Sequence, residues 1–374
     1  MTTSEVMGAG QQWILQFCHG YDGPFLDCAR QYAALFKGTP YKVCTVYLTG
    51  APSTEVEAGS ASDEVIFLDY SSRQVRGLKL AALRDFRRVA ASRDFAFCIA
   101  HRFKPVYVAL LGSQLPVIGV HHAFGDYRRR SRQLFVNFFR KRLALLGVSD
   151  AVRDDMRGCL PGWPDERIET LYNRIDIAAV QAEQVSREAA REHLGLPQDA
   201  WIVGNVGRLH PDKDQATLIR GFAQALPQLP AGSLLAIMGS GRLESQLMAL
   251  ATDLGIRDAV RFLGQVPHGR RYFKAFDQFA LTSDHEPFGM VLIEAMAAGV
   301  PVVCSDCGGG REVVEGVGRL FALGDSSDLA RALLSESQSS SDAELRLKAR
   351  FSDAAVAVQW QQVMRAWGLG GLGD

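Results

Sequence analysis

Short apolar runs alternate with longer amphipathic stretches along most of the chain. Several runs are apolar throughout, a pattern typical of strands that are covered on both faces in a parallel sheet. Strands are predicted over residues 13–18, 42–48, 64–68, 96–100, 117–120, 143–148, 201–206, 234–238, 260–263, 278–281 and 300–304. Helices are predicted between them, for example over 25–37, 215–225 and 242–254. Repetition of strand and helix in both halves predicts an α/β protein with two doubly wound parallel-sheet domains.

A boundary between the two domains is predicted near residue 177. A polar helix is expected over 181–194, and Gly195-Leu196-Pro197 would break it before the next strand. We therefore predict an N-terminal domain over 1–177 and a C-terminal domain over 178–352. The remaining segment, 353–374, is expected to hold a helix and to end in a disordered glycine-rich tail.

Composition excludes several classes of protein. The 374 residues carry 41 Lys and Arg and 41 Asp and Glu, whereas a nucleic-acid binder normally has a large positive excess. The seven cysteines are an odd number, which fits a reducing compartment. No apolar run approaches the roughly 20 residues of a membrane-spanning helix, and residues 1–12 lack the features of a secretory signal. We expect a cytoplasmic protein that binds no nucleic acid.

Common metal and nucleotide signatures are missing from the sequence. Cys304 and Cys307 form a lone Cys-x-x-Cys pair, so buried structural thiols are favoured and no metal site is predicted. The loop around Ser240, Gly239-Ser240-Gly241-Arg242, follows a strand, but Glu244 stands where a dinucleotide fingerprint has its third glycine. No Walker-type loop is found either.

The strongest candidate chemistry follows the predicted strand 278–281. A helix is expected to begin near Pro287, because proline lacks the N–H that is unpaired in a first helical turn. The free amides of that turn would then hold a phosphate: those of Phe288, Gly289 and Met290. Glu286 and Glu294 are eight residues apart, about two helical turns, so both would face one cleft. Glu294 would accept hydrogen bonds from two ribose hydroxyls; the alternative is a helix start with exposed acids.

Two cations follow the predicted strand 201–206. Arg208 and Lys213 lie on a loop before a helix, where they would hold a diphosphate, the arginine as a fork and the lysine as a point charge. A solvated basic loop is the alternative interpretation of this segment.

Strand ends in the first half also carry polar residues. Gly20, Tyr21 and Gly23 follow the first strand, and the glycines would let a phosphate approach the backbone. Histidines follow two further strands of the same predicted sheet: His101 with Arg102, and His121 with His122. Structural and catalytic roles for these histidines remain open.

These motifs together resemble retaining glycosyltransferase family 4, which has the GT-B fold. The most specific part is Glu-Pro-Phe-Gly followed by Glu-Ala-Met-Ala-Ala-Gly-Val-Pro-Val-Val, over residues 286–303. Further matches are Gly207-Arg208-Leu209 with Lys213, Phe262–Val266 and Asn173-Arg174-Ile175-Asp176, together with Gly308-Gly309 and Glu312. The chain departs from the family pattern where Gly20 and Gly23 replace adjacent glycines and where Arg174 replaces the glycine of an Asn-Gly pair.

The resemblance implies two Rossmann-like domains that face each other across a cleft. The C-terminal domain would bind a nucleoside diphosphate sugar and the N-terminal domain most of the acceptor. The helix after residue 353 would cross back onto the first domain, with Trp360 as the candidate contact. By motif position the catalytic residues would be His121, Arg208, Lys213 and Glu286. The donor would contact Gly23, Ser240, Val266, Phe288, Gly289, Met290 and Glu294, and acceptor-side candidates are Gly20, Tyr21, His101, Arg102 and His122.

The resemblance also implies the reaction, which is transfer of a sugar to a hydroxyl with retention of anomeric configuration. No metal and no cofactor beyond the donor substrate is expected. A cell-surface glycan or glycolipid acceptor is favoured, lipopolysaccharide core in particular. The alternatives are a nucleotide-sugar epimerase of GT-B fold and a non-catalytic two-domain sugar-binding protein.

Residues 128–142 suggest a further partner. They hold seven basic residues, four aromatic or leucine positions and no acid. Such a stretch suits an anionic surface on the inner face of the cytoplasmic membrane, or a phosphorylated acceptor. A helix that packs its aromatic residues into the core and keeps its charges in water would have the same sequence, and both interpretations stay open.

Overall fold

The computed structural model describes residues 12–23, 25–336 and 340–368, and their contacts divide the chain into two compact units. The N-terminal unit holds the described residues up to Val148, then Val152–Leu171, and those from Ala357 onward. The C-terminal unit holds Ser149–Ala151 and the described residues of Tyr172–Val356. The disorder predicted for 369–374 falls outside the described residues.

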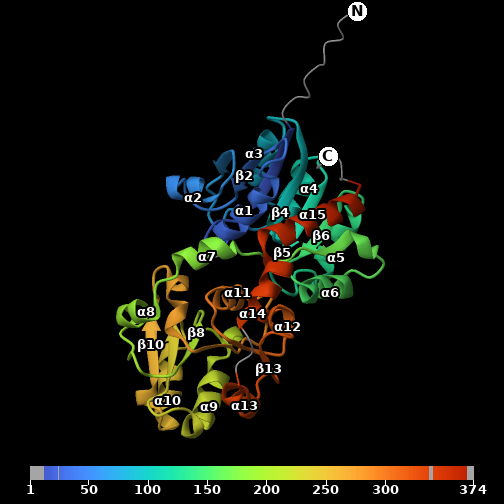
Figure 1. The fold of residues 1–374 in the computed structure, drawn as a ribbon. Coiled ribbons are helices and arrows are strands. Elements are labelled where there is room, and N and C mark those ends of the chain that lie inside the picture. The colour runs from blue at the N-terminus through green and yellow to red at the C-terminus, as the bar shows by residue number, and fades with distance from the viewer. Residues whose placement is uncertain (1–11, 24, 337–339, 369–374) are drawn as a thin grey trace, which may run out of the picture. The chain divides into compact units, whose positions relative to one another are not determined.

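The N-terminal unit is built on a seven-stranded parallel sheet of order β3-β2-β1-β4-β5-β6-β7 (Figure 1). Its strands are β1 Gln12–Cys18, β2 Tyr41–Tyr47, β3 Glu64–Phe67, β4 Phe95–His101, β5 Val117–His121, β6 Leu143–Gly147 and β7 Ile168–Thr170. Its helices are α1 Phe25–Ala33, α2 Thr54–Gly59, α3 Leu80–Ala90, α4 Phe103–Gly112 and α5 Arg130–Phe138, and α6 Asp150–Cys159 begins in the other unit.

The C-terminal unit contains a six-stranded parallel sheet of order β10-β9-β8-β11-β12-β13. Its strands are β8 Ile202–Val206, β9 Leu234–Met238, β10 Val260–Gly264, β11 Gln278–Leu281, β12 Val302–Ser305 and β13 Arg319–Phe321. Its helices are α7 Ile177–Glu183, α8 Arg187–Leu194, α9 Gln215–Ala225, α10 Glu244–Asp253, α11 Met290–Ala297, α12 Gly308–Val314, α13 Ser326–Leu334 and α14 Ser340–Arg346.

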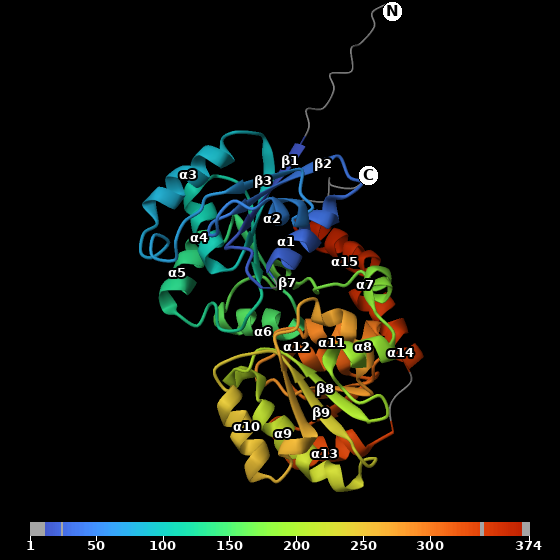
Figure 2. The ribbon, with the colours of Figure 1, turned by 90° about the vertical axis from the view of Figure 1, so that its left-hand side faces the viewer.

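Helices cover both faces of the C-terminal sheet. Helices α9, α10 and α13 lie together on one face, where Leu218, Phe222 and Leu329 pack with Leu235 and Ile237 of β9 (Figure 2). Helices α11 and α12 lie on the other face, against β11 and β12. The central strands β8, β9, β11 and β12 are therefore buried on both sides, which explains their uninterrupted apolar runs in the sequence.

The sequence prediction of two doubly wound parallel-sheet domains is confirmed. All eleven predicted strands are present with small shifts at their ends, while β7 and β13, each of three residues, were not predicted. The single helix predicted over 181–194 is wrong, because the structure has two helices, α7 and α8, with Gln184–Ser186 between them. Ser186 caps α8 by accepting a hydrogen bond from the amide of Ala189, and this cap starts a new helix.

The last helix, α15 Asp353–Ala366, begins in the C-terminal unit and continues into the N-terminal unit. Its Trp360 is buried there, with ring centroids 5.8 Å from Phe36 and 6.5 Å from Phe97. The return of the last helix to the first unit was expected from the family resemblance.

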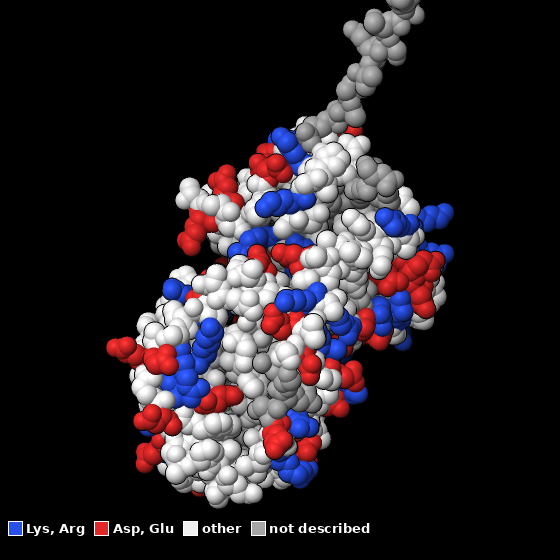
Figure 3. Space-filling view, viewed as in Figure 1, with Lys and Arg blue, Asp and Glu red and all other residues white. Residues whose placement is uncertain are grey.

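Charges of both signs are mixed on the surface. On the face shown in Figure 3, Lys and Arg alternate with Asp and Glu over each unit. The part of the chain that the structure describes includes no helix that is both long and apolar enough to cross a membrane.

Candidate functional site

Three loops meet at the carboxyl ends of β8, β9 and β10. The amide of Leu209 donates to the carbonyl of Ser240 at 3.0 Å, and the amide of Gly239 donates to the carbonyl of Gly264 at 2.7 Å. The predicted donor residue Ser240 therefore lies beside the loop of Arg208, and Val266 follows Gly264 by two residues. Ligands bind at this edge in open parallel sheets, because the loops and helix starts converge there.

Gly239 is required by this arrangement. Its φ is +141°, and a Cβ built on it would lie 1.9 Å from the carbonyl oxygen of Gly207. Gly241 is similarly constrained, because its Cβ would lie 2.3 Å from the carbonyl oxygen of Leu209. Only glycines allow the two loops to approach this closely.

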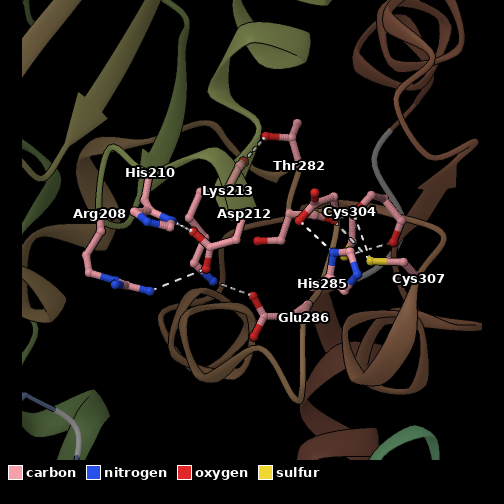
Figure 4. A network of polar contacts seen from close by, with 12 residues as sticks. Arg208, His210, Asp212, Lys213, Thr282, His285, Glu286, Cys304 and Cys307 are labelled. Atoms are coloured by element: carbon pink, nitrogen blue, oxygen red, sulfur yellow. Dashed lines mark hydrogen bonds and ion pairs between the residues drawn. The ribbon is translucent and has the colours of Figure 1, made fainter. Parts of the chain in front are cut away.

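Lys213 is fixed by contacts with the loop after β11. It is the last residue of a short 3-10 helix, Pro211–Lys213, and its carbonyl accepts a hydrogen bond from Thr282 Oγ1 at 2.9 Å. The carbonyl of Asp212 accepts from the amide of Asp284 at 3.1 Å. These bonds hold the loops of β8 and β11 together (Figure 4).

Lys213 and Glu286 form an ion pair in the interior of this site. The Nζ–Oε2 distance is 2.8 Å, and the side chains are only 19% and 9% exposed (Figure 4). The sequence predicted both residues but not their direct contact. Since the pair is largely shielded from water, its charges interact more strongly than a surface pair would.

Arg208 is positioned differently from Lys213. Its side chain is 70% exposed, and Nη2 lies 3.3 Å from Asp212 Oδ2. The same carboxylate binds His210 Nδ1, so Asp212 orients both side chains (Figure 4). Asp212 was not among the predicted site residues, although its spacing of four from Arg208 is a signal for such a pair.

The segment after β11 differs from the prediction at its helix start. Helix α11 begins at Met290 with Gly289 as its N-cap at φ +97°, so Pro287 is not in the first turn. Glu286 therefore precedes the helix, and the expectation that two helical turns separate it from Glu294 is wrong. Half-buried Glu294 lies within α11.

Glu286 is held by its backbone instead. Its carbonyl accepts a hydrogen bond from the amide of Gly309 at 2.8 Å. A Cβ on Gly309 would lie 2.3 Å from the carbonyl oxygen of Pro287, so α12 and this loop are in close contact. Phe288 is buried against Phe351, and the amides of 288–290 lie at the start of α11, where helical acceptors are lacking.

The two cysteines of the Cys-x-x-Cys pair bond to backbone carbonyls beside this site. Cys307 Sγ donates to the carbonyl of Ser283 at 3.0 Å, and Cys304 Sγ donates to that of Ser305 at 3.3 Å. Both thiols are free, and burial raises the pKa of Cys304. Across residues 12–23, 25–336 and 340–368, no group of three His, Cys, Asp or Glu is placed to hold a metal ion.

In the N-terminal unit the predicted histidines form two arrangements. His121 is fully buried, with Nδ1 2.7 Å from Asp126 Oδ2 and Nε2 2.8 Å from the hydroxyl of Tyr127. Both of its ring nitrogens are therefore occupied by neighbours that the sequence analysis did not single out. Its predicted catalytic role stays a prediction.

His122 and His101 form the second arrangement. His101 Nδ1 lies 3.2 Å from His122 Nε2, and the rings are stacked. His122 is partly exposed, while the Nε2 atom of buried His101 has no hydrogen-bond partner among the described residues. Burial, followed by electrostatic interaction with His121 and Arg102, lowers the pKa of His122 to about 3. Burial also lowers the pKa of His101, so both rings are neutral near pH 7.

The loop after β1 is shaped by its glycines and by Tyr21. Gly23 has φ +61°, and a Cβ on Gly20 would lie 2.8 Å from Thr49 Oγ1. Tyr21 donates its hydroxyl hydrogen to the carbonyl of Ala51 at 2.8 Å. The separated glycines thus serve separate purposes: Gly23 supplies a left-handed turn, and Gly20 allows close contact with the loop after β2.

Arg174, the second departure from the family pattern, is structural in this chain. Its side chain is buried, and Nε lies 2.7 Å from Asp353 Oδ1 at the start of α15. The neighbouring amide of Ile175 donates to the carbonyl of Phe351 at 2.9 Å. The arginine therefore anchors the segment that leads into the last helix.

A family model described as glycosyl transferases group 1 matches residues 186–353 of this chain. The chain is 32% identical over 215 residues to the lipopolysaccharide core biosynthesis glycosyltransferase LpsE of Rhizobium meliloti. That match covers 56% of this chain and 56% of LpsE, so the chain spans about half the length of this relative.

Solved structures match nearly the whole chain. A glycosyltransferase from Rickettsia africae superimposes with a TM-score of 0.81, covering 96% of this chain and 99% of that one at 13% identity. HepE of Anabaena, solved in complex with UDP and glucose, gives a TM-score of 0.75 at 23% identity, covering 94% and 99%. These likenesses establish the two-domain GT-B fold that the sequence motifs implied.

Proposed function

We propose, from the premise that residues 186–353 belong to the glycosyl transferases group 1 family, that the chain is a retaining glycosyltransferase using a nucleoside diphosphate sugar. The observation that carries the proposal is the site on the C-terminal unit. A shielded Lys213–Glu286 pair lies there beside three loops at the carboxyl edge of the sheet and the start of α11. A lysine, an arginine and open helix amides are suited to stabilise the charge of a departing diphosphate.

In the proposed reaction, the bond from the anomeric carbon of the donor sugar to the diphosphate oxygen breaks. The acceptor hydroxyl oxygen forms a new bond to that carbon from the same face, so configuration is retained. The acceptor proton passes to the leaving phosphate oxygen, and no oxidant, reductant or metal is required for the balance. Lys213 and Arg208 would bind the diphosphate, and Glu286 would lie near the sugar.

Donor recognition is assigned to the C-terminal unit. Ser240 and Val266 lie on the loops beside Arg208 and would contact the diphosphate and the base, while Glu294 of α11 would bind the ribose hydroxyls. The relative HepE has been solved with UDP and glucose, which supports a uridine nucleotide as the first donor to test. No cofactor besides the donor is proposed.

For the acceptor we propose a glycan or glycolipid, with lipopolysaccharide core favoured because LpsE is named for that pathway. The N-terminal unit would supply the acceptor contacts, since its strand ends carry Gly20, Tyr21, His101, Arg102 and His122.

We also propose that α5 docks on an anionic membrane surface. Leu134 and Phe138 are 72% and 82% exposed, whereas Phe135 packs against Phe103 and Tyr107. Large apolar side chains that are exposed among arginines are typical of helices that bind anionic membrane surfaces. Flotation with phosphatidylglycerol vesicles tests this: Leu134→Ser with Phe138→Ser should abolish binding, and binding unchanged by these substitutions would contradict it.

Thermal shift with UDP-, GDP-, ADP- and CMP-linked sugars tests the donor. A ligand that binds only the folded chain raises its melting temperature. We expect one nucleotide to raise it in the parent and to do so less in Lys213→Ala. Turnover of that donor only when an acceptor is present would separate transfer from epimerisation, and a shift that Lys213→Ala leaves intact would contradict the assigned site.

A further inference from the structure

A cluster of cations surrounds the first turns of α4 in the N-terminal unit. Lys79, the residue before α3, places its Nζ 4.5 Å from the ring centre of Tyr107. Arg132 of α5 places its guanidinium 4.3 Å from the ring centre of Phe103. Helices α3, α4 and α5 follow one another along one side of this unit (Figure 2). Cations from two neighbouring elements thus converge on two aromatic rings of one helix.

Further cations belong to the same cluster. Arg102, the residue between β4 and α4, lies 4.9 Å from the ring centre of Phe25. Lys104 is in the first turn of α4, and its charge interacts with those of Arg76, Arg102 and Arg132. We call Arg76, Lys79, Arg102, Lys104 and Arg132 the α4 cation cluster.

The cluster is electrostatically unfavourable in the absence of an anion. Burial lowers the pKa of Lys79, and repulsion by Lys104 and Arg132 lowers it further. Burial also lowers the pKa of Lys104, again with repulsion by the neighbouring arginines. Since like charges held close together cost free energy, a bound anion would relieve this repulsion.

Few acids compensate the cluster among the described residues. Asp126 pairs with Arg132 at 3.0 Å, but its other oxygen binds His121 at 2.7 Å. Asp22 interacts with His19 and raises its pKa, against the lowering by Lys104 and Arg102. The remaining positive charge is therefore available to a ligand.

Backbone strain points to the same place. Lys79 has φ +55° and Arg102 has φ +76°, a region that residues other than glycine rarely occupy. Two cations of one cluster are thus held in unfavourable backbone conformations, and such strain concentrates at ligand sites.

The position in the fold favours a small ligand over a flat surface. Arg102 follows β4, and His19 follows β1, at the carboxyl edge of the sheet where ligands bind in open α/β folds. Burial, then the charges of Lys104 and Arg102, lowers the pKa of His19 to about 4, and its Nδ1 has no partner in the described structure. A neutral imidazole with a free nitrogen can donate to a phosphate oxygen beside the cations.

We propose that the α4 cation cluster binds a phosphate group on the acceptor, so that the acceptor class is a phosphorylated sugar or glycan. The identification of the ligand as an acceptor rests on the proposed transferase function, whereas the anion site itself rests on residues of the N-terminal unit alone. Lysine and arginine supply the charge, the free amides at the start of α4 add donors, and His19 adds a neutral one.

Titration of the full chain with inorganic phosphate tests the site, with chloride at equal ionic strength as the reference. We expect saturable binding that weakens about tenfold in Lys104→Gln and in Lys79→Asn, in line with loss of one charge-assisted hydrogen bond. Asparagine tolerates the left-handed backbone of position 79. The control is Lys42→Gln, because Lys42 also lies over a ring, 5.7 Å from that of Trp13, but near the amino end of β2.

Three results would overturn the proposal. The first is absence of phosphate binding, or binding that Lys104→Gln and Lys79→Asn leave unchanged. The second is displacement, by a nucleoside diphosphate, of the phosphate whose binding Lys104→Gln and Lys79→Asn weaken, which would assign the cluster to the donor. The third is binding to phosphatidylglycerol vesicles that requires these lysines while phosphate does not bind. Nucleotide thermal shifts in the same variants report on the C-terminal unit, so failure of the proposed function is recognised separately.

Discussion

Removal of Lys213 should damage stability and catalysis for different reasons, and the two can be separated. In Lys213→Ala the carboxylate of Glu286, only 9% exposed, loses the partner that lies 2.8 Å away. Breaking a fully buried pair costs roughly 3–5 kcal/mol, and the 19% exposure of Lys213 reduces this to about 2 kcal/mol. Urea unfolding of parent and variant measures the loss.

Lys213→Ala is also expected to lower kcat/KM strongly. A preorganised group that stabilises charge on the leaving diphosphate contributes about 2–4 kcal/mol, which corresponds to roughly 30- to 1000-fold in kcat/KM. The rate of nucleoside diphosphate release in the presence of acceptor provides the assay. Lys274→Ala, an exposed lysine of the same unit, is the control and should retain parent stability and rate.

A double substitution decides between the two roles of Lys213. Lys213→Met with Glu286→Gln removes both charges, so no buried charge is left unpaired and most of the stability should return. Activity should stay low, because the diphosphate still lacks its cation. Parent activity in Lys213→Ala, or recovery of activity together with stability in the double variant, would refute the assigned role.

Three further outcomes are expected from packing and protonation. Because the folded chain holds the pKa of His122 at about 3, below its unfolded value of about 6.5, the unfolded chain takes up the proton first and the free energy of unfolding falls as pH drops through that window. His122→Asn should reduce that fall by about 2 kcal/mol between pH 7 and pH 5 in urea titrations, and an unchanged slope would contradict it. Gly239→Ala places a methyl group 1.9 Å from a carbonyl oxygen and should lower the unfolding free energy by about 2–4 kcal/mol, whereas Gly158→Ala in open space should be neutral or stabilising. Trp360→Ala should lower the free energy of unfolding by about 3–5 kcal/mol, whereas Val358→Ala, at an exposed position of the same helix, should lower it by less than about 0.5 kcal/mol. Equal melting temperatures of the two variants would contradict the docking of α15 on the N-terminal unit.

Most strands were predictable because the central strands of both sheets are buried on both faces. A run such as Leu234–Met238 must be apolar at every position, and this leaves an unambiguous signal in the sequence. The edge strands Ile168–Thr170 and Arg319–Phe321 have three residues each and mix polar with apolar positions. No periodicity can be read from so few residues, so both were missed.

The site was predictable in its residue types but not in its contacts. Polar residues at strand ends identified Lys213 and Glu286, because the carboxyl edge of a parallel sheet is where ligands bind. The start of α11 was misplaced, since a left-handed Gly289 delays the helix beyond Pro287. Contacts between distant segments, such as Lys213 with Glu286, depend on tertiary packing and have no local signal.

The two anion sites should respond differently to salt. On the C-terminal unit an anion must compete with Glu286 for Lys213, a pair 2.8 Å apart and largely shielded from water. In the α4 cation cluster the charges that act on Lys104 are those of Arg76, Arg102 and Arg132, and Arg76 and Arg102 are exposed. Exposed charges are screened over about 8 Å at physiological ionic strength, whereas shielded pairs are screened much less. Phosphate affinity should therefore fall more steeply than nucleotide affinity when NaCl rises from 50 to 300 mM. Equal slopes in calorimetric titrations would mean that the cluster is as shielded as the Lys213 site, against the exposure seen in the structure.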